Sequence, residues 1–219
     1  SATVMNERLF QIGTVSALFH DVGYLRRLDD TEKQHGAEYT STHVGRGADF
    51  MASYLPQVGL ADLAEPATKI VHFTGYEVPV TQIQIEPQYR MVGNLLGSAD
   101  ILAQMADRCY LEKCRDRLYP EFVLGGIARQ VDKQGKEKVI FASPADLIFK
   151  TPGFFQGASK RLEQDLGGVY RYIGRHFQGE NLYYSVVRKN IEYARTITET
   201  GDVSLLRRSL PDPGLAEAA

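Results

Sequence analysis

The sequence has few of the features that mark a secreted or membrane-bound protein. Cys109 and Cys114 are too few for a disulfide scaffold. They lie in one predicted helix, where their side chains would not face each other, so we expect both to be reduced and structural. No apolar run approaches the roughly 20 residues that a membrane-spanning helix needs. The first residues lack the basic region and small-residue cleavage site of a secretory signal, and we expect a soluble, cytoplasmic protein without membrane contact.

The sequence also lacks a strong charge of either sign. A formal net charge of −2 over 219 residues gives no general field for nucleic acid or for an anionic membrane. Any anion-binding site must therefore be local, and no strong case for DNA or RNA arises. There is no internal repeat and no low-complexity segment. The length suits one core with an appendage, or two small domains.

Apolar residues recur at helical spacing through most of the first 118 residues. This pattern predicts helices over 7–19, 40–55, 65–73 and 89–118. Pro66 would lie in the first turn of the third helix, where proline is tolerated. We therefore predict an all-α fold for this part of the chain.

The pattern changes after Pro120. Two apolar segments flank a polar turn that contains Gly135, which predicts a small β-hairpin near residues 126–142. Ser143 and Pro144 then indicate a helix start, and the pattern stays mostly helical to residue 208. We expect interruptions at 151–153 and 178–179, and a frayed tail over 211–219.

Histidines and carboxylates fall at the ends or on the inner faces of the predicted helices. Asp100 lies among small and apolar residues, where an unpaired carboxylate costs several kcal/mol, so we expect a partner such as a cation. Neutral imidazoles plus carboxylates suit a dinuclear Fe, Mn, Zn or Mg site. Each histidine alone also fits a helix cap or a satisfied core residue. The candidate ligands are His20, Asp21, His43, His72 and Asp100.

Residues 17–23, Ala-Leu-Phe-His-Asp-Val-Gly, resemble the signature of the HD-domain metal-dependent phosphohydrolase superfamily. Residues 43–48, with a histidine followed by Gly-Ala, resemble its next helix. Residues 70–72 and 98–103 resemble the segments that carry its next histidine and its last aspartate. The resemblance covers roughly residues 9–118 and implies an HD-type metal-binding helical domain over 1–120. Residues 121–219 would form a helical extension with the hairpin.

The resemblance implies one or two divalent ions. His20 and Asp21 would bind metal, with Asp21 bridging two ions, while His43 and His72 would serve the second ion. Asp100 would complete the first. His35, in the preceding loop, is a rival to His43 but lacks the Gly-Ala that follows.

Chemistry and resemblance together imply metal-assisted hydrolysis of a phosphate ester. The substrate would be a small phosphorylated, nucleotide-like molecule, and a homodimer is a further expectation. Asp21 and Arg46 are the candidate catalytic residues. Arg46, Lys150, Arg171 and Arg175 are the candidate substrate-binding residues, and for each of them a solvated or ion-paired surface charge is the alternative.

Two other functions stay open. The family has a further histidine on a helix upstream of the His-Asp pair, and this sequence shows no counterpart. Its absence implies either a weakened first metal position or a degenerate module that binds a nucleotide or a partner without turnover. An HD-type di-iron oxygenase is the third hypothesis. Tyr24 stands where the cyclic-diguanylate hydrolases of the family carry a lysine. Residues 167–177 mix aromatics, arginines and glycines, as a lid over a base would, or as a helical core would.

Overall fold

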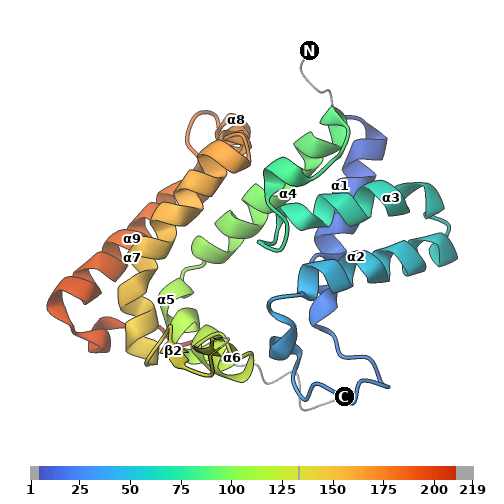
Figure 1. The fold of residues 1–219 in the computed structure, drawn as a ribbon. Coiled ribbons are helices and arrows are strands. Elements are labelled where there is room, and N and C mark those ends of the chain that lie inside the picture. Colours follow the sequence, from blue (N-terminus) through green and yellow to red (C-terminus); the bar gives the residue numbers. More distant parts are fainter. Residues whose placement is uncertain (1–4, 133, 211–219) are drawn as a thin grey trace.

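The computed structural model describes residues 5–132 and 134–210. The fold is mainly helical with one small antiparallel hairpin, as predicted (Figure 1). The α-helices and strands are α1 (Glu7–Phe19), α2 (His43–Tyr54), α3 (Ala61–Ile70), α4 (Pro87–Met105), α5 (Tyr110–Lys113), α6 (Tyr119–Leu124), β1 (Arg129–Val131), β2 (Glu137–Val139), α7 (Pro144–Lys160), α8 (Tyr172–His176) and α9 (Leu182–Thr200). Short 3₁₀ turns η1 (Val22–Tyr24), η2 (Gly36–Tyr39) and η4 (Val71–Phe73) connect the first helices.

Helix α4 runs between two groups of helices. Figure 1 shows α1, α2 and α3 on one side of it and α7 and α9 on the other. The first group and the N-terminal part of α4 enclose one apolar cluster, which includes Ile12, Val44, Met51, Ile70 and Val92. Burial of these side chains stabilises the group by roughly 1.5–3 kcal/mol for each large residue.

A second apolar cluster joins the C-terminal part of α4 to α7 and α9. Leu102 and Met105 on α4 and Leu111 on α5 pack here with Ile148 and Ile191. These α4 and α5 residues belong to the segment assigned to the first domain. The domain boundary predicted at residue 120 stays a prediction. The apolar side chains of α4 already divide between the two clusters, so the change from one cluster to the other lies before residue 120.

The predicted helix over 89–118 is broken. Helix α4 ends at Met105, and Asp107 makes a turn in which its Oδ1 accepts a hydrogen bond from Cys109 N at 2.7 Å. Asn190 of α9 donates to the carbonyls of Met105 and Asp107, at 2.8 and 2.9 Å. The chain then continues as α5, a π-helical turn (Cys114–Leu118) and α6, which contains Pro120. The apolar periodicity of the sequence continues past Met105, but hydrogen bonds from Asn190 of α9 stabilise a turn there, so α4 ends.

Two predictions about proline were wrong. Helix α3 begins at Ala61 instead of residue 65, so Pro66 lies in its interior and is buried. Residues 151–153 do not interrupt α7, which contains Pro152. Thr151 is buried there and its hydroxyl donates to Leu147 O at 3.0 Å. Packing of the buried neighbours outweighs the cost of a missing N–H donor at both sites.

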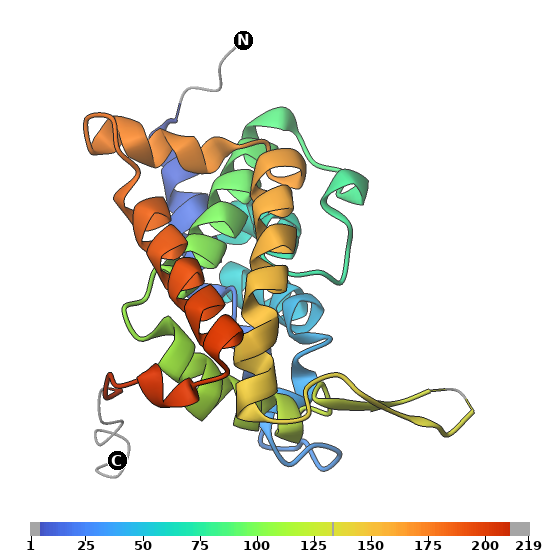
Figure 2. The same cartoon turned by 90° about the vertical axis from the view of Figure 1, so that its left-hand side faces the viewer.

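The hairpin and the following helix start are confirmed. Strand β1 pairs with β2 with Arg129 opposite Val139, and both strands are exposed. Figure 2 shows the hairpin projecting from the helices. Ser143 caps α7 by accepting from Asp146 N at 3.1 Å. The predicted turn is present at Gln178, whose φ is 59°, and the tail over 211–219 lies outside the described residues.

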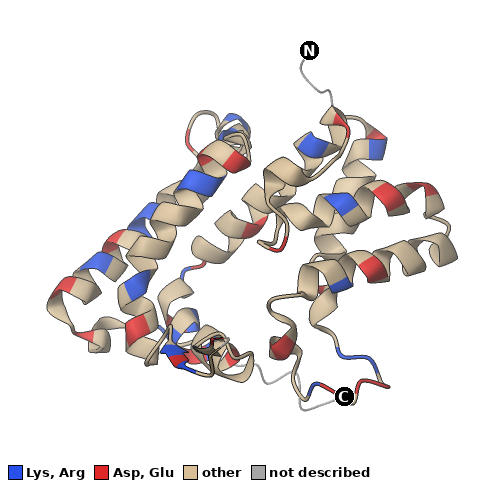
Figure 3. Ribbon diagram, viewed as in Figure 1, with Lys and Arg blue, Asp and Glu red and all other residues tan. Residues whose placement is uncertain are grey.

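Basic and acidic residues are interspersed over the helices (Figure 3). Within the residues that the structure describes, no helix combines the length and the apolar character needed to cross a membrane.

Candidate metal centre and adjoining cavity

Four of the five predicted ligands come together where α1 ends, α2 begins and α4 passes. His20 Nε2 lies 3.3 Å from Asp21 Oδ2 and 3.8 Å from Asp100 Oδ1. His43 Nε2 lies 3.7 Å from Asp21 Oδ1. Asp21 therefore lies between the two imidazoles. We call His20, Asp21, His43 and Asp100 the His-Asp cluster.

Gly23 explains how α1 and α2 bring these residues so close. A Cβ at this position would lie 1.8 Å from the carbonyl oxygen of His43 and 2.8 Å from Gly47 N. No larger residue fits this contact between the η1 turn and the first turn of α2. The glycine that follows His-Asp-Val in the sequence thus serves the approach of Asp21 to His43.

Backbone carbonyls orient both imidazoles of the cluster. His20 Nδ1 lies 2.8 Å from Ala17 O and His43 Nδ1 lies 2.9 Å from Thr40 O, so each Nδ1 carries a proton and donates it. In the neutral tautomer this leaves the Nε2 lone pairs directed at the carboxylates. Metal-binding histidines are held in this way in many proteins. Tyr24 stacks on His43, with centroids 4.2 Å apart, and limits its rotation.

The electrostatics of the cluster favour a positive charge. The hydrogen bond to Asp21 raises the pKa of His20 to about 9, and the same bond lowers the pKa of Asp21. Burial raises the pKa of Asp100, which is a carboxyl group in need of a cation. A protonated His20 supplies that charge when no metal is bound, and a metal ion would displace the proton.

His72 stands apart from the other predicted ligands. It lies in the η4 turn, and its Nδ1 is buried without a hydrogen-bond partner in the described part of the chain. Burial lowers its pKa, while the charges of Glu77 and Asp49 raise it. Its ring makes no ion pair with Asp21 or Asp100 in the described residues. The rival His35 is exposed and takes part in a capping box with Glu38 at the start of η2.

The separations within the cluster bear on whether it fits a metal. Two ligand atoms about 2.1 Å from one ion, at angles of 90–110°, lie roughly 3.0–3.4 Å apart. The His20–Asp21 pair is within this range and the other two pairs exceed it by a few tenths of an ångström. Across residues 5–132 and 134–210, however, no group of three or more His, Cys, Asp or Glu side chains is arranged to hold an ion as it stands. One donor pair thus has the separation that a shared ion requires, and the other donors would have to move closer together to complete a metal site.

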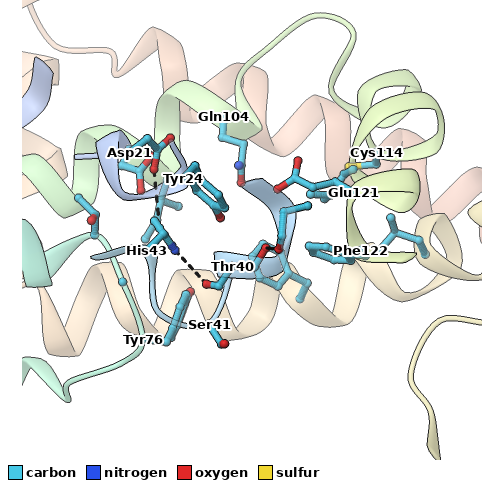
Figure 4. A pocket seen from close by; sticks show the side chains of 18 of the residues that line it. Asp21, Tyr24, Thr40, Ser41, His43, Tyr76, Gln104, Cys114, Glu121 and Phe122 are labelled. Carbon is cyan, nitrogen blue, oxygen red and sulfur yellow. Dashed lines mark hydrogen bonds and ion pairs between the residues drawn. The ribbon is translucent and has the colours of Figure 1, made fainter. Parts of the chain in front are cut away.

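A cavity of about 1010 Å³ adjoins the cluster (Figure 4). Asp21 and His43 lie on one side of it, and Glu121 and Phe122 lie on the opposite side. Glu121 was not predicted as a site residue, and its pKa is raised by burial and by the charge of Asp21. Other lining residues that were not predicted as site residues are Tyr24, Thr40, Ser41, Tyr76, Glu77, Gln104, Tyr110, Phe122, Phe141 and Phe154.

Glu77 illustrates why these residues were missed. Its carboxylate accepts from Val44 N at 2.8 Å and Gly45 N at 2.9 Å, so it caps α2 beside His43. The residue that precedes α2, Thr42, makes no side-chain cap. A cap that comes from a segment 33 residues further along the chain leaves no local signal in the sequence.

The four predicted phosphate-binding cations have different surroundings. Lys150 lines the cavity, and its Nζ contacts Asp146 and Ile140 O, at 2.8 and 2.7 Å. Arg46 donates to Gly23 O at 2.9 Å and Leu25 O at 3.0 Å.

The guanidinium of Arg46 also lies 3.5 Å from the Tyr39 ring centroid. It therefore fixes the η1 turn instead of facing the cavity. Arg171 pairs with Glu163, and Arg175 lies over Tyr172, both outside the lining. Of the four predicted cations, Lys150 alone lines the cavity.

Arg161 is a buried cation that was not predicted from the sequence as a site residue. It donates to Phe73 O at 2.8 Å and Gly75 O at 2.5 Å, and its guanidinium lies 4.0 Å from the Tyr76 ring centroid. Through these bonds Arg161, the first residue after α7, holds the loop that carries Tyr76 and Glu77 against the cavity.

Comparisons of the chain with models of known protein families, with curated proteins and with solved structures found no match.

Proposed function

We propose that the chain is a metal-dependent phosphohydrolase that cleaves a phosphate ester of a small, nucleotide-like molecule. The observation that supports this most is the approach of His20 and His43 Nε2 to the carboxylates of Asp21 and Asp100 at one side of the cavity. The resemblance of residues 17–23 to the HD signature supports the same reaction class.

The chain's own residues would hold one or two divalent ions. His20, Asp21 and Asp100 would hold the first, and His43 with Asp21 the second, while His72 would need to turn toward the cluster to join them. Such ions, when bound, neutralise charge on phosphate oxygens and lower the pKa of water. The carbonyls of Ala17 and Thr40 would keep both imidazoles in the correct tautomer.

Hydrolysis of bis(p-nitrophenyl) phosphate with added Mn²⁺ tests the proposal. We expect turnover that falls to the uncatalysed rate in Asp21→Ala. Asp29→Ala is the matched control, because Asp29 is an exposed acid in the loop after η1. Turnover that survives in Asp21→Ala, or is absent with every divalent metal tried, would contradict the proposal.

One observation favours a second candidate, a module that binds a nucleotide or a partner without turnover. His72 lies apart from the cluster, and no group of three donors in the described residues is ready to hold an ion. Tight nucleotide binding with no hydrolysis under any metal would support this function.

A further inference from the structure

The cavity walls beyond the His-Asp cluster are largely aromatic. The lining includes Tyr24, Tyr76, Tyr110, Phe122, Phe141 and Phe154. Phe122 and Phe141 stack with centroids 5.5 Å apart and an interplanar angle of 25°. Phe154 lines the cavity and is 49% exposed, so part of its ring is free to contact a bound molecule. Flat apolar faces of this kind bind planar groups by stacking and exclusion of water.

The charges of the lining are unequal. Among the described residues, the lining contains four carboxylates, Asp21, Glu77, Asp100 and Glu121, and one lysine or arginine, Lys150. Lys150 is already paired with Asp146, which removes most of its attraction for an added anion. Ions at the cluster would offset Asp21 and Asp100 but would leave Glu121 across the cavity uncompensated. A phosphate would therefore be attracted at the cluster, whereas a second anionic group further into the cavity would be repelled.

We infer that the cavity selects a phosphate ester whose other group is planar, aromatic and not anionic, and that it discriminates against phosphate chains. Only the phosphate part of this inference rests on the proposed function. The aromatic recognition comes from the walls that α6, α7 and the segment between β2 and α7 supply, and it does not require a metal.

Fluorescence titration of the metal-free protein tests the aromatic recognition directly. The chain has no tryptophan, so the emission of 1-naphthol or 1-naphthyl phosphate is read with little background. In EDTA we expect saturable binding of 1-naphthol, and weaker binding of 1-naphthyl phosphate because the carboxylates repel it. Adenosine should displace 1-naphthol at lower concentration than ATP does.

Variants locate the bound probe. Phe154→Ala removes a half-exposed ring and should weaken 1-naphthol binding by about three- to tenfold. Phe141→Leu is a second variant that keeps the wall filled, and it should weaken binding in the same direction. Phe10→Ala is the matched control, because Phe10 is 66% exposed on α1 and does not line the cavity. Its affinity for 1-naphthol should not change.

Three results would overturn the inference. They are the absence of saturable 1-naphthol binding, equal affinity for 1-naphthol in both cavity variants and the wild type, and displacement of 1-naphthol in EDTA by ATP at a lower concentration than by adenosine. Addition of Zn²⁺ separates this inference from the proposed function. Zn²⁺ should strengthen binding of 1-naphthyl phosphate and leave 1-naphthol unchanged. If 1-naphthol binds as expected but Zn²⁺ has no effect, the metal-dependent function fails while the aromatic site stands.

Discussion

Gly23 has a measurable role at the scale of single residues. A methyl group at this position would overlap the backbone of α2, so Gly23→Ala must push the η1 turn away from His43. We expect a loss of about 1–3 kcal/mol in the free energy of unfolding, as for other overpacked contacts. Thermal unfolding followed by circular dichroism measures it.

Gly153→Ala is the control for this substitution. Gly153 lies within α7, and nothing lies within 4 Å of an added Cβ. The higher helix propensity of alanine should leave the stability unchanged or raise it by up to about 1 kcal/mol. Equal effects of the two substitutions would show that the close contact at Gly23 is not important.

At Asp100, the stability of the fold and the proposed metal binding have opposite requirements. Burial raises the pKa of Asp100, which means that its ionised form destabilises the metal-free fold at neutral pH. Asp100→Asn should therefore raise the Tm of the metal-free protein by about 2–4 °C, the shift that about 1 kcal/mol gives at this size, and lower its metal content. Differential scanning calorimetry in EDTA measures the Tm.

The exposed Asp49→Asn should change neither the Tm nor the metal content. A lower Tm for Asp100→Asn would show that this carboxylate stabilises the metal-free fold.

At the scale of elements, Asn190 of α9 determines the break between α4 and α5. Its amide donates to the carbonyls of Met105 and Asp107, which would lose a partner in Asn190→Ala. Because unsatisfied buried polar groups cost about 1–3 kcal/mol each, we expect a loss of about 2–4 kcal/mol in urea unfolding. Lys189→Ala, on the exposed face of the same helix, should change stability by less than about 0.5 kcal/mol. Similar values for both would contradict this role.

Local signals made several elements predictable. Ser143 and Pro144 start α7 through a cap within one turn, and Gly135 lies in the turn that joins β1 to β2. His20 and Asp21 are adjacent in sequence, so their proximity needed no knowledge of the fold. His43 and Asp100 were added because each lies in a predicted helix and because residues 43–48 and 98–103 resemble segments of the HD superfamily that carry a histidine and an aspartate.

Contacts between distant segments could not be predicted in the same way. Glu77 caps α2, Arg161 holds the loop after η4, and Glu121 reaches the cavity from α6. Each is an ordinary charged residue in the sequence, and only the packing of the two helix groups gives it a role. Arg46 is the opposite case, a residue that was predicted at the site and has another role. Its position one turn after His43 indicated a phosphate contact, but its guanidinium donates to the carbonyls of Gly23 and Leu25.

At the scale of the whole molecule, the stability of the metal-free protein should depend on pH through His20. Its pKa is about 9 in the fold and 6.5 in the unfolded chain. A raised pKa contributes stability that is full below pH 6.5 and is lost as the pH rises through about 9. In EDTA the Tm should therefore fall between pH 6.5 and 9, and His20→Asn should reduce this fall. A Tm that rises over the same interval would contradict the pairing of His20 with Asp21.

The metal content of the purified chain, measured by inductively coupled plasma mass spectrometry, tests the central claim most directly. We predict one or two equivalents of Fe, Mn or Zn per chain, lost in Asp21→Ala and kept in Asp29→Ala. Absence of metal after reconstitution with each of these ions, or equal metal content in Asp21→Ala, would contradict a metal centre at the His-Asp cluster.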